Sequence, residues 1–447
     1  MKKEKVRKSP GKILLAVLGW ILGIFLGLAL ILFFVNVGCA LSLRNYIRSF
    51  DPVEYGPDRI APYYNEDNGY YEIKADGDLK IMQLTDIHLG GGFYTYKRDK
   101  KTIYEVITML QKEKPDIVVA TGDNTFCVPA PFDGGNTFNN KMTAKTVIDI
   151  FEHEKVYFTT TFGNHDTESF DFYSRQQLAE AYMDDKYEYC FFDQDFTDPD
   201  ADTVPSATNQ IIPVRGSDGK IKKIILLIDT NAYLDTSLSA SLNWEYDTIH
   251  DVQVDWAADA IKKLSKDEGL PEGTYLKTVT FMHIPISEYK LAYDELVEET
   301  ENADGSVTYT EKKSDIAERI FGWWDEKDGI CCGGWKSDVP LAQKDKFFEV
   351  LSDEMGCLEA VFCGHDHVNN VAVRYKGVIL AYGYSIDNTA YSDIRSYGFQ
   401  RGATIIDLEN AGGIDITYKN AYADYGCDPD KFYTVDTSTP YYTDHYR

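Results

Sequence analysis

Positive charge is scarce in this 447-residue sequence. It contains 45 Lys and Arg against 72 Asp and Glu, and its formal net charge is −27. Six of the basic residues fall within the first twelve positions, so the remainder is more acidic still. Such a surface repels polyanions, and no nucleic acid partner is therefore expected. It also repels a small phosphate substrate unless bound cations reverse the field locally.

C-x-x-C motifs are lacking, which argues against a zinc ribbon or a thioredoxin-type site. Of the eight cysteines, seven lie after Cys39, so disulfide pairing outside the cell would leave at least one thiol free. Several buried free thiols are the alternative. Internal repeats are absent too. The hydrophobic fraction of 44%, with 32 Tyr and 23 Phe, nevertheless predicts a folded globule.

One segment lacks charge altogether. Residues 13–35 are uncharged and follow six Lys and Arg. At about 1.5 Å per residue this segment spans the roughly 30 Å core of a bilayer, and its basic flank should stay cytoplasmic. We therefore expect a basic cytoplasmic tail over 1–12, a transmembrane signal anchor over 13–37 and an extracytoplasmic remainder, as a single-pass membrane protein. A lipoprotein signal ending at Val37-Gly38-Cys39 and a buried soluble helix are the alternatives.

Short apolar runs alternate with amphipathic segments beyond residue 78. Strands are expected over 79–84, 116–120, 156–162, 221–229, 276–282 and 361–363, and helices over 97–112, 144–154, 174–183, 252–264 and 344–355. This alternation predicts an α/β (α+β-like) domain over 79–420, with its ligand site beyond the carboxyl ends of the strands. Residues 38–78 are expected to form a juxtamembrane linker or an edge segment, 291–314 a hairpin turn or lid, and 421–447 a Tyr- and Asp-rich tail.

Metal-capable side chains follow five of the expected strands. They are Asp86 and His88, then Asp123, then Asn164 with His165 and Asp166, then His283, and finally His365 with His367. Carboxylate, amide and imidazole ligands without thiolate suit Mn, Fe or Zn. Two such divalent or trivalent ions about 3.5–4 Å apart need a shared anionic bridge and can then clamp a phosphoryl group. Asp123 is the expected bridge, because Gly122 before it allows close backbone approach. A simple helix cap is the alternative for Asp123.

The residues after Asn164 are the catalytic candidates. A water held between two metal ions would become hydroxide near neutral pH and attack phosphorus in line. The leaving alcohol then needs a proton, and His165, adjacent to Asn164, is the candidate general acid. Asp166 is the second catalytic candidate.

In their order along the chain, these motifs resemble those of the calcineurin-like metallophosphoesterases. The motifs are Asp86-x-His88, Gly122-Asp123, Gly163-Asn164-His165-Asp166, His283 and Gly364-His365-x-His367. The resemblance covers about 79–408 and implies a two-sheet sandwich flanked by helices around a dinuclear metal site. It also implies two ligand sets that share one carboxylate: Asp86, His88, Asp123 and His367, and Asp123, Asn164, His283 and His365. By the same resemblance, His165 donates the proton and contacts phosphate.

Residues 246–247 with 253–256, then 282–285 and 364–369, are similar to one branch of this family. That branch comprises the dosage-dependent cell-cycle regulator type and the short purple-acid-phosphatase-like proteins. Phe126 stands where purple acid phosphatases have Tyr, and they lack the histidine present here as His88, so no purple colour is expected. Residues 125–127 also lack the Asp and Arg of the Ser/Thr phosphatase type, so that specificity does not transfer directly.

The sequence therefore predicts a metal-dependent phosphoesterase. The leading hypothesis is a membrane-anchored phosphomonoesterase that acts outside the membrane on a phosphorylated small molecule, lipid or protein. The alternatives are a phosphodiesterase or pyrophosphatase acting on nucleotides or envelope lipids, and a catalytically silent binding module whose aromatic surface engages carbohydrate. Residues 323–324 and 333–335, rich in Trp and Gly, are candidates for a substrate loop, with core packing as the alternative.

Overall fold

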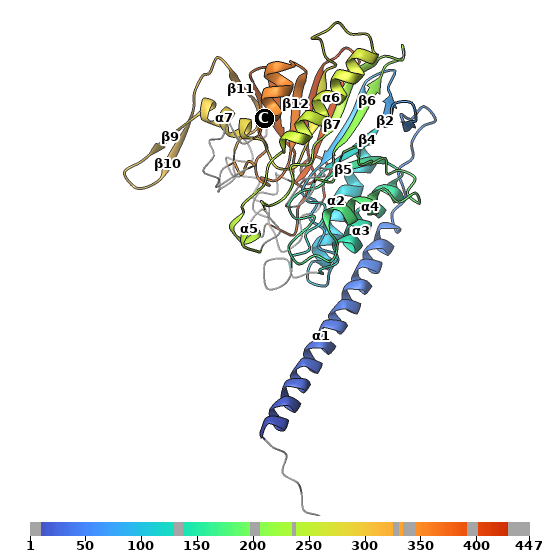
Figure 1. The fold of residues 1–447 in the computed structure, drawn as a ribbon, viewed down its shortest axis with the longest axis vertical. Coiled ribbons are helices and arrows are strands. Elements are labelled where there is room, and N and C mark those ends of the chain that lie inside the picture. Colours follow the sequence, from blue (N-terminus) through green and yellow to red (C-terminus); the bar gives the residue numbers. More distant parts are fainter. Residues whose placement is uncertain are drawn as a thin grey trace, which may run out of the picture.

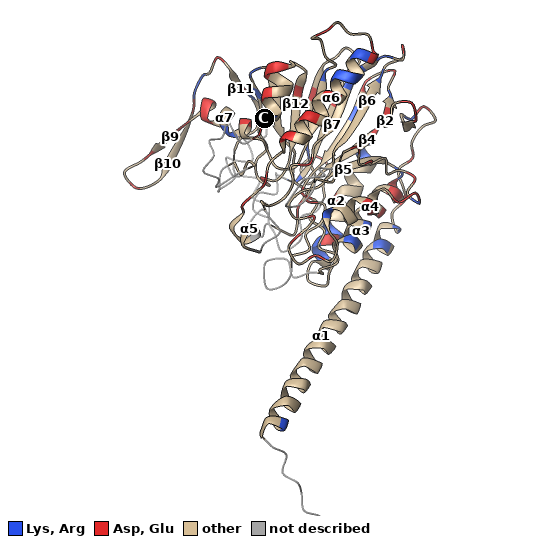
Figure 2. Cartoon of the chain, viewed as in Figure 1, with Lys and Arg blue, Asp and Glu red and all other residues tan. Residues whose placement is uncertain are grey.

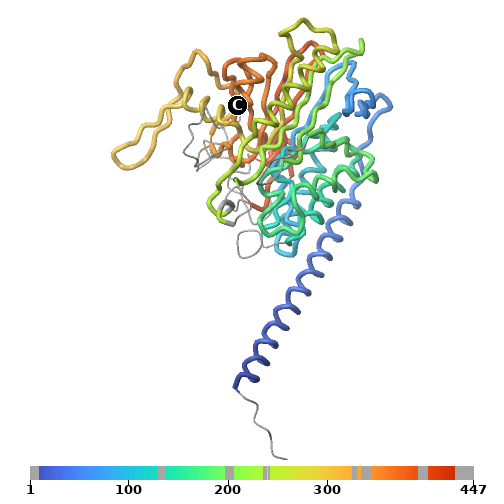
Figure 3. The backbone as a smooth tube through the Cα atoms, in the orientation of Figure 1, coloured from blue at the N-terminus to red at the C-terminus, as the bar shows by residue number. Residues whose placement is uncertain are grey.

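The computed structural model describes residues 10–128, 137–196, 206–234, 238–324, 330–333, 345–390 and 401–427. Over these ranges the chain forms two sheets packed as a sandwich and covered by helices, and one long helix projects from this body (Figures 1 and 3). This is the architecture that the motifs predicted. The two sheets bring their polar loops to one edge.

The smaller sheet has five strands in the order β16-β15-β3-β4-β5. Its strands are β3 (Leu79–Leu84), β4 (Ile117–Thr121), β5 (Tyr157–Thr161), β15 (Gly402–Leu408) and β16 (Ile414–Asn420). β3, β4 and β5 are parallel, and α2 (Tyr96–Glu113) and α3 (Asn140–Glu154) connect them. Each connecting helix runs back along the sheet, so the carboxyl ends of these strands lie beside the amino ends of α2 and α3.

The larger sheet has nine strands in the order β1-β2-β6-β7-β8-β12-β14-β13-β11. Its strands are β1 (Pro62–Asn65), β2 (Tyr70–Lys74), β6 (Gln210–Arg215), β7 (Ile221–Leu227), β8 (Thr278–Phe281), β11 (Ala317–Phe321), β12 (Leu358–Cys363), β13 (Ala372–Tyr375) and β14 (Val378–Tyr382). β7, β8, β12 and β14 are parallel, so their carboxyl ends share an edge. A bridge between Thr85 and Ser385 joins this edge to the end of β3.

The apolar strands are buried on both faces. Along β3, Leu79 and Ile81 enter the core between the sheets, while Met82 and Leu84 pack against helices. Successive strand residues point to opposite faces, so a continuous apolar run suits a sheet covered on both sides. α2, α3 and α4 (Arg175–Tyr182) cover the smaller sheet. α6 (Asp251–Asp267), α7 (Ser287–Leu296) and the π-helix Glu349–Glu354 cover the larger one.

Several segments differ from expectation. Within 38–78, α1 (Pro10–Ile47) ends and β1 and β2 form one edge of the larger sheet, which is the edge segment offered as the alternative to a linker. The domain boundary at residue 79 stays a prediction. α7 and β16 were not predicted, because polar and aromatic residues interrupt their apolar pattern. The helix expected over 344–355 is a π-helix at Glu349–Glu354.

Within the insertion over 291–314, residues 291–296 belong to α7, and β9 (Val297–Glu301) and β10 (Val307–Glu311) form a hairpin that stands out from the body (Figure 1). Trp323 and Trp324 pack against the core beside the larger sheet, which favours packing over a substrate loop. Residues 334–335, 1–9 of the basic tail and 428–447 of the C-terminal tail lie outside the described residues. All eight cysteines are free thiols.

α1 has two parts that differ in burial. Its uncharged residues 13–35 are exposed, and this part projects from the body (Figures 1 and 3). The last turns pack on the domain through Asn36, Ala40, Leu43 and Ile47. Among the described residues, α1 is the helix that is both long enough and apolar enough to cross a membrane. It is compatible with a single span or a signal anchor.

Glu72 ties β2 to the neighbouring strand β6. Its carboxylate accepts hydrogen bonds from Arg215 at 2.7 and 2.9 Å, and from Tyr63 and Asn68. Burial alone would raise the pKa of Glu72, but these partners outweigh burial and lower the pKa to about 2. A carboxyl with a lowered folded pKa stabilises the fold above its unfolded pKa of about 4.3, and this contribution is lost as the pH falls towards 2.

We expect Glu72→Gln to lower the free energy of unfolding at neutral pH by about 1–2 kcal/mol, and to flatten its dependence on pH between roughly 4.5 and 2. Denaturant unfolding of the full chain across this pH range measures both effects. Glu298→Gln, at an exposed position of β9, is the matched control. Unchanged stability of the Glu72 variant would contradict a structural role for β2.

Candidate active site

Polar loops occupy the edge where the parallel strands of both sheets end. Every site residue that the sequence predicted lies in one of these loops. Asp86 and His88 follow β3, Asp123 follows β4, Asn164, His165 and Asp166 follow β5, His283 follows β8, and His365 and His367 follow β12. All of them are buried except His165, which is half-buried. The fold therefore gathers at one edge residues that are far apart in sequence.

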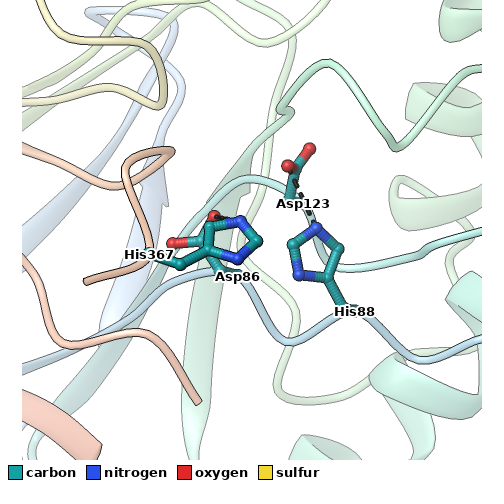
Figure 4. A group of neighbouring side chains, drawn as sticks. All are labelled: Asp86, His88, Asp123 and His367. Carbon is teal, nitrogen blue, oxygen red and sulfur yellow. Dashed lines mark hydrogen bonds and ion pairs between the residues drawn. The ribbon is translucent and has the colours of Figure 1, made fainter. Parts of the chain in front are cut away.

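Asp86, His88, Asp123 and His367 form a first cluster (Figure 4). His88 Nε2 lies 3.1 Å from Asp123 Oδ2, and His367 Nε2 lies 3.3 Å from Asp86 Oδ1. One ligand atom from each of the four residues lies within 4.8 Å of the others. Asp86 Oδ2 is buried without a hydrogen-bond partner among the described residues, which is costly unless a cation meets that oxygen.

Asp123, His283 and His365 form a second cluster, again with ligand atoms within 4.8 Å of one another. His283 Nε2 lies 3.2 Å from Asp123 Oδ2 and 3.3 Å from Asn164 Oδ1. His283 Nδ1 donates to a backbone carbonyl of β4 at 2.9 Å, which leaves Nε2 as the ligand atom. Asn164 Nδ2 donates to the Tyr233 hydroxyl, so Oδ1 faces the cluster. Asp123 therefore belongs to both clusters, as a bridging ligand would.

The chemistry of these donors fits two metal ions. The clusters offer carboxylates, imidazoles and one amide oxygen, and no thiolate, which suits Mn, Fe or Zn. Burial raises the pKa of Asp123, but His283 and His165 outweigh burial and hold that pKa well below its ordinary value. The carboxylate shared by the two clusters therefore stays charged. The unpartnered Asp86 Oδ2 and the shared Asp123 mark the two places where a cation would be stabilised.

Four cluster residues have a left-handed backbone. Their φ angles are 52° at Asp86, 48° at His88, 50° at Asp123 and 75° at His365. This conformation costs on the order of 1–2 kcal/mol for a residue with a side chain. Hydrogen bonds offset the cost: Asp86 N donates to Gly122 O at 3.1 Å, and His88 N donates to Asp123 O at 2.8 Å. The loops after β3 and β4 thus hold each other in place.

Two glycines allow the close approach of these loops. A Cβ atom at Gly163 would lie 2.1 Å from Asp123 Oδ1 and 2.6 Å from His283 Nε2. A Cβ atom at Gly122, where φ is +85°, would lie 2.6 Å from His283 Nδ1. Neither position admits a side chain without displacing a cluster residue. The expectation that Gly122 permits close backbone approach agrees with this geometry.

His165 lies on the open side of the clusters, and its side chain is 25% exposed. Its backbone N–H donates to Asp123 Oδ1 at 2.7 Å, and its Nδ1 lies 2.5 Å from Glu168 Oε1. Burial lowers the pKa of His165, but Asp123 and Glu168 outweigh burial and raise it. The ring packs against Phe126, which also contacts His88. Glu168 engages Nδ1, so Nε2 is the nitrogen left for a substrate.

Asp166 is enclosed. Its Oδ1 accepts a hydrogen bond from Thr125 N at 3.0 Å, and its Oδ2 accepts one from Gly163 N at 2.8 Å. Burial, together with the charge of Asp123, raises the pKa of Asp166 to about 6. The side chain ties the loop after β5 to the loop after β4. This arrangement favours a positioning role over the catalytic role expected from the sequence.

Three supporting residues were not identified from the sequence. Asp387, after β14, lies 3.6 Å from His88 Nδ1 and 3.7 Å from His367 Nδ1, so one carboxylate faces the rear of two imidazoles. Arg175 pairs with Asp229 and donates to the backbone of the loop after β5 at 2.8 Å. Asp229 ends the strand expected over 221–229, so the strand-end pattern that found the other residues could have found it.

The sandwich, the strand-end loops and the paired clusters define a metallophosphoesterase fold with a candidate dinuclear metal site. The chain belongs to the calcineurin-like phosphoesterase family, whose family model matches residues 79–369. This confirms the family that the motifs predicted.

The relatives are purple-acid-phosphatase-like proteins and a DCR2 phosphatase, which agrees with the predicted branch of the family. Over 359 residues the chain is 25% identical to probable inactive purple acid phosphatase 29 of Arabidopsis thaliana, covering 75% of this chain and 78% of that one. Over 311 residues it is 25% identical to phosphatase DCR2 of Saccharomyces cerevisiae, covering 67% of this chain and 46% of that one. Among solved structures, a dimetal phosphatase from Danio rerio matches with 12% identity and a TM-score of 0.41, covering 77% of this chain and 96% of that one.

We expect Gly163→Ala to weaken metal binding by roughly 10–100-fold, the size of effect seen when the surroundings of metal ligands are altered. The reason is that the new Cβ, 2.1 Å from Asp123 Oδ1, must displace that carboxylate or His283. Titration of the metal-stripped full chain with Mn measures the affinity. Gly77→Ala, whose Cβ meets nothing within 4 Å, is the control. Equal affinity in both variants would contradict the close packing of these loops.

Proposed function

We propose that this protein is a membrane-anchored phosphomonoesterase with two metal ions. The observation that carries the proposal is the sharing of buried Asp123 by two clusters of metal-capable side chains, with His165 at their open side. Membership of the phosphoesterase family supports ester hydrolysis at phosphorus. The relatives are named phosphatases, which supports a monoester over a diester.

The ligand sets follow the two clusters. Asp86, His88, Asp123 and His367 would hold one ion, and Asp123, Asn164, His283 and His365 the other. Bound Mn, Fe or Zn would supply an activated water and neutralise charge on the phosphoryl group. Asp387 would orient His88 and His367 from behind, and Asp166 would hold the loop that presents Asn164.

His165 is the proposed general acid. Its partly exposed ring has Nδ1 engaged by Glu168, which supports Nε2 as the nitrogen that would face a substrate. As the phosphorus–oxygen ester bond breaks, the proton on Nε2 passes to the leaving alcohol. The hydrogen bond from His165 N to Asp123 Oδ1 ties this acid to the bridging ligand.

A silent binding module is the alternative that the name of the Arabidopsis relative, a probable inactive phosphatase, brings forward. Two observations favour catalysis. Every ligand position carries a competent side chain, and the cluster residues keep costly left-handed backbones that a mere binding surface would not need.

The N-terminal helix supports an uncleaved anchor. Residues 13–35 of α1 are exposed and apolar, and the basic residues before them favour a cytoplasmic N-terminus with the domain on the other side. Asn36 is buried, and its Oδ1 accepts a hydrogen bond from Phe93 N at 3.0 Å. Lipoprotein cleavage before Cys39 would remove Asn36, so this contact favours the anchor over the lipoprotein.

The test compares two monoesters on the Mn-loaded full chain in detergent. We expect His165→Ala to lower the turnover of an alkyl phosphate by about 10²–10⁴-fold, because an alkoxide needs a proton to leave. A nitrophenyl phosphate should lose far less, because nitrophenolate leaves unprotonated. Asp123→Asn should abolish the turnover of both esters together with metal binding. His153→Ala, at a histidine outside the site, is the control.

The remaining outcomes separate the alternatives. Faster turnover of bis(nitrophenyl) phosphate than of the monoester would identify a diesterase. Equal losses on the alkyl and aryl esters in His165→Ala would contradict its role as general acid. Stoichiometric metal binding with no turnover of any ester would support the silent binding module.

A further inference from the structure

Aromatic side chains are exposed in the loops at the site-bearing edge. Phe93 and Tyr94 precede α2, Phe138 precedes α3, and Phe170 and Phe172 follow β5. Between 38% and 59% of each side chain is exposed, in a part of the fold where solvent would favour polar residues. These five residues are called the aromatic rim below. Two of its loops are tied together, since Phe172 N donates to Phe138 O at 2.8 Å and the two rings stack.

The aromatic rim begins where α1 leaves the domain. Phe93 N donates to Asn36 Oδ1 at 3.0 Å. Asn36 directly follows Val35, the last residue of the uncharged segment 13–35. The exposed rings of Phe93 and Tyr94 therefore lie level with the end of the apolar, projecting part of α1.

α2 and α3 place the remaining loops on the same side. Ser42 of α1 bonds to Tyr96 at the start of α2. Asp51, which follows the end of α1, accepts a hydrogen bond from Gln111 near the end of α2, so α2 runs in the same direction as α1. Two contacts give the same result for α3. Arg44 pairs with Asp149, and Phe50 O, further along the chain, accepts a hydrogen bond from His153, which is further along α3, so α3 also runs in the direction of α1. The amino ends of α2 and α3 thus point to the side from which α1 projects (Figure 1). The carboxyl ends of β3, β4 and β5, and with them the metal-capable clusters, lie at this edge.

Short connections link the aromatic rim to the site. Gly90 N and Gly91 N, which follow His88, both donate to buried Asp99 at 3.0 Å, and this fixes the loop that carries Phe93. At the start of α3, Asn140 Nδ2 donates to Asp166 O at 3.1 Å. The rim and the site therefore form one rigid edge.

The opposite side of the site also carries exposed apolar side chains. Leu234, Leu242 of α5 (Leu238–Asn243) and Trp244 are exposed by 43–59%. Their neighbours line the site: Tyr233 binds Asn164, and Tyr246 packs on His365. In Figure 1, α5 lies at the lower edge of the body, on the side from which α1 projects. Apolar side chains therefore flank the site on two sides.

Basic residues lie at this edge on α2 and α3, beside the aromatic rim, while Glu168 and Asp171 lie in the loop of Phe170 and Phe172. Lys97, Lys100 and Lys101 lie in the first turns of α2, and Lys141 and Lys145 lie in those of α3. Figure 2 shows basic residues on these helices near the junction with α1. In a protein of net charge −27, basic residues beside exposed aromatic residues suit the headgroup layer of a membrane with anionic lipids.

We propose that the aromatic rim inserts into the interfacial layer of the bilayer that α1 enters, so that the site takes phosphate monoesters carried by membrane lipids. This rests on the anchor and the phosphomonoesterase proposed above. In the reaction, water oxygen bonds to phosphorus and the bond from phosphorus to the lipid oxygen breaks. The lipid alcohol takes up one proton, and inorganic phosphate is released. The aromatic rim positions the domain and does not take part in the chemistry.

Depth-dependent quenching tests the location of the aromatic rim without any substrate. The full chain is reconstituted into phosphatidylcholine vesicles with brominated acyl chains, and Trp is introduced into a Trp20→Phe background as Phe93→Trp or Phe172→Trp. This background keeps five native Trp residues, Trp244 among them, so its own emission is measured in the same vesicles and subtracted. We expect quenching of both introduced residues, and none for Tyr309→Trp on the outlying hairpin. An unquenched rim would overturn the proposal. The difference in quenching between the parent protein and the Trp20→Phe background reports Trp20, and so the anchor, separately. Failure of the anchor and failure of the rim are therefore distinguishable.

Turnover tests the substrate class. The variant Phe93→Ser/Tyr94→Ser/Phe172→Ser is compared with a control variant, Val307→Ser/Tyr309→Ser/Ile320→Ser, which changes exposed residues on β10 and β11. We expect the rim variant to lose about tenfold or more in kcat/KM on phosphatidate in vesicles, with little change on soluble nitrophenyl phosphate. The control should keep both activities. Loss on both substrates or on neither would overturn the lipid assignment. Wild-type protein that hydrolyses no ester would overturn the phosphomonoesterase itself and leave the quenching result standing.

Discussion

Asp123 is a fully buried carboxylate that contacts both halves of the site. It lies within 3.2 Å of two imidazole nitrogens, one from the smaller sheet's loops and one from the larger sheet's, and it accepts the backbone N–H of His165. A charge removed from water is tolerated only where partners of opposite sign or hydrogen-bond donors replace the solvent. The position of Asp123 therefore requires both sheets to end at one edge. The sandwich supplies this geometry, and metal ions at the two clusters would supply the positive charge.

The backbone around Asp123 shows what holding that carboxylate requires. Left-handed conformations at Asp86, His88 and Asp123 oppose the normal preference of residues with side chains. They persist because the loops bond to one another, and because Arg175 and Asp229 form a buried ion pair beneath the loop after β5. Strain gathered at a site and offset by its surroundings is typical of a functional centre. The same features would serve little purpose in a domain that only packs.

Sequence reasoning located the loops that carry the candidate ligands, and the reason is local. Each candidate ligand follows an apolar run whose period and length identify a buried strand, so Asp86, Asp123 and His283 could be placed at strand ends without coordinates. Asp387 could not be found in this way, because its importance depends on His88 and His367, which are distant in sequence. The catalytic role of Asp166 stays a prediction, because sequence could not show how its side chain is held. Its neighbours in sequence are functional, but its oxygens are engaged by backbone groups of the surrounding loops.

The relation between the anchor and the site is a tertiary property that no single segment determines. The sequence predicts a membrane helix from charge and length, and predicts a site from strand ends, but it leaves the angle between the two undefined. That angle depends on Asn36, Ser42 and Arg44, three polar side chains near the end of α1 that bond to the loop before α2, to α2 and to α3. A flexible linker after residue 37 would have left the site free to face any direction. Because α1 instead continues into the domain to Ile47 and packs there, an anchored chain would hold its site towards the membrane.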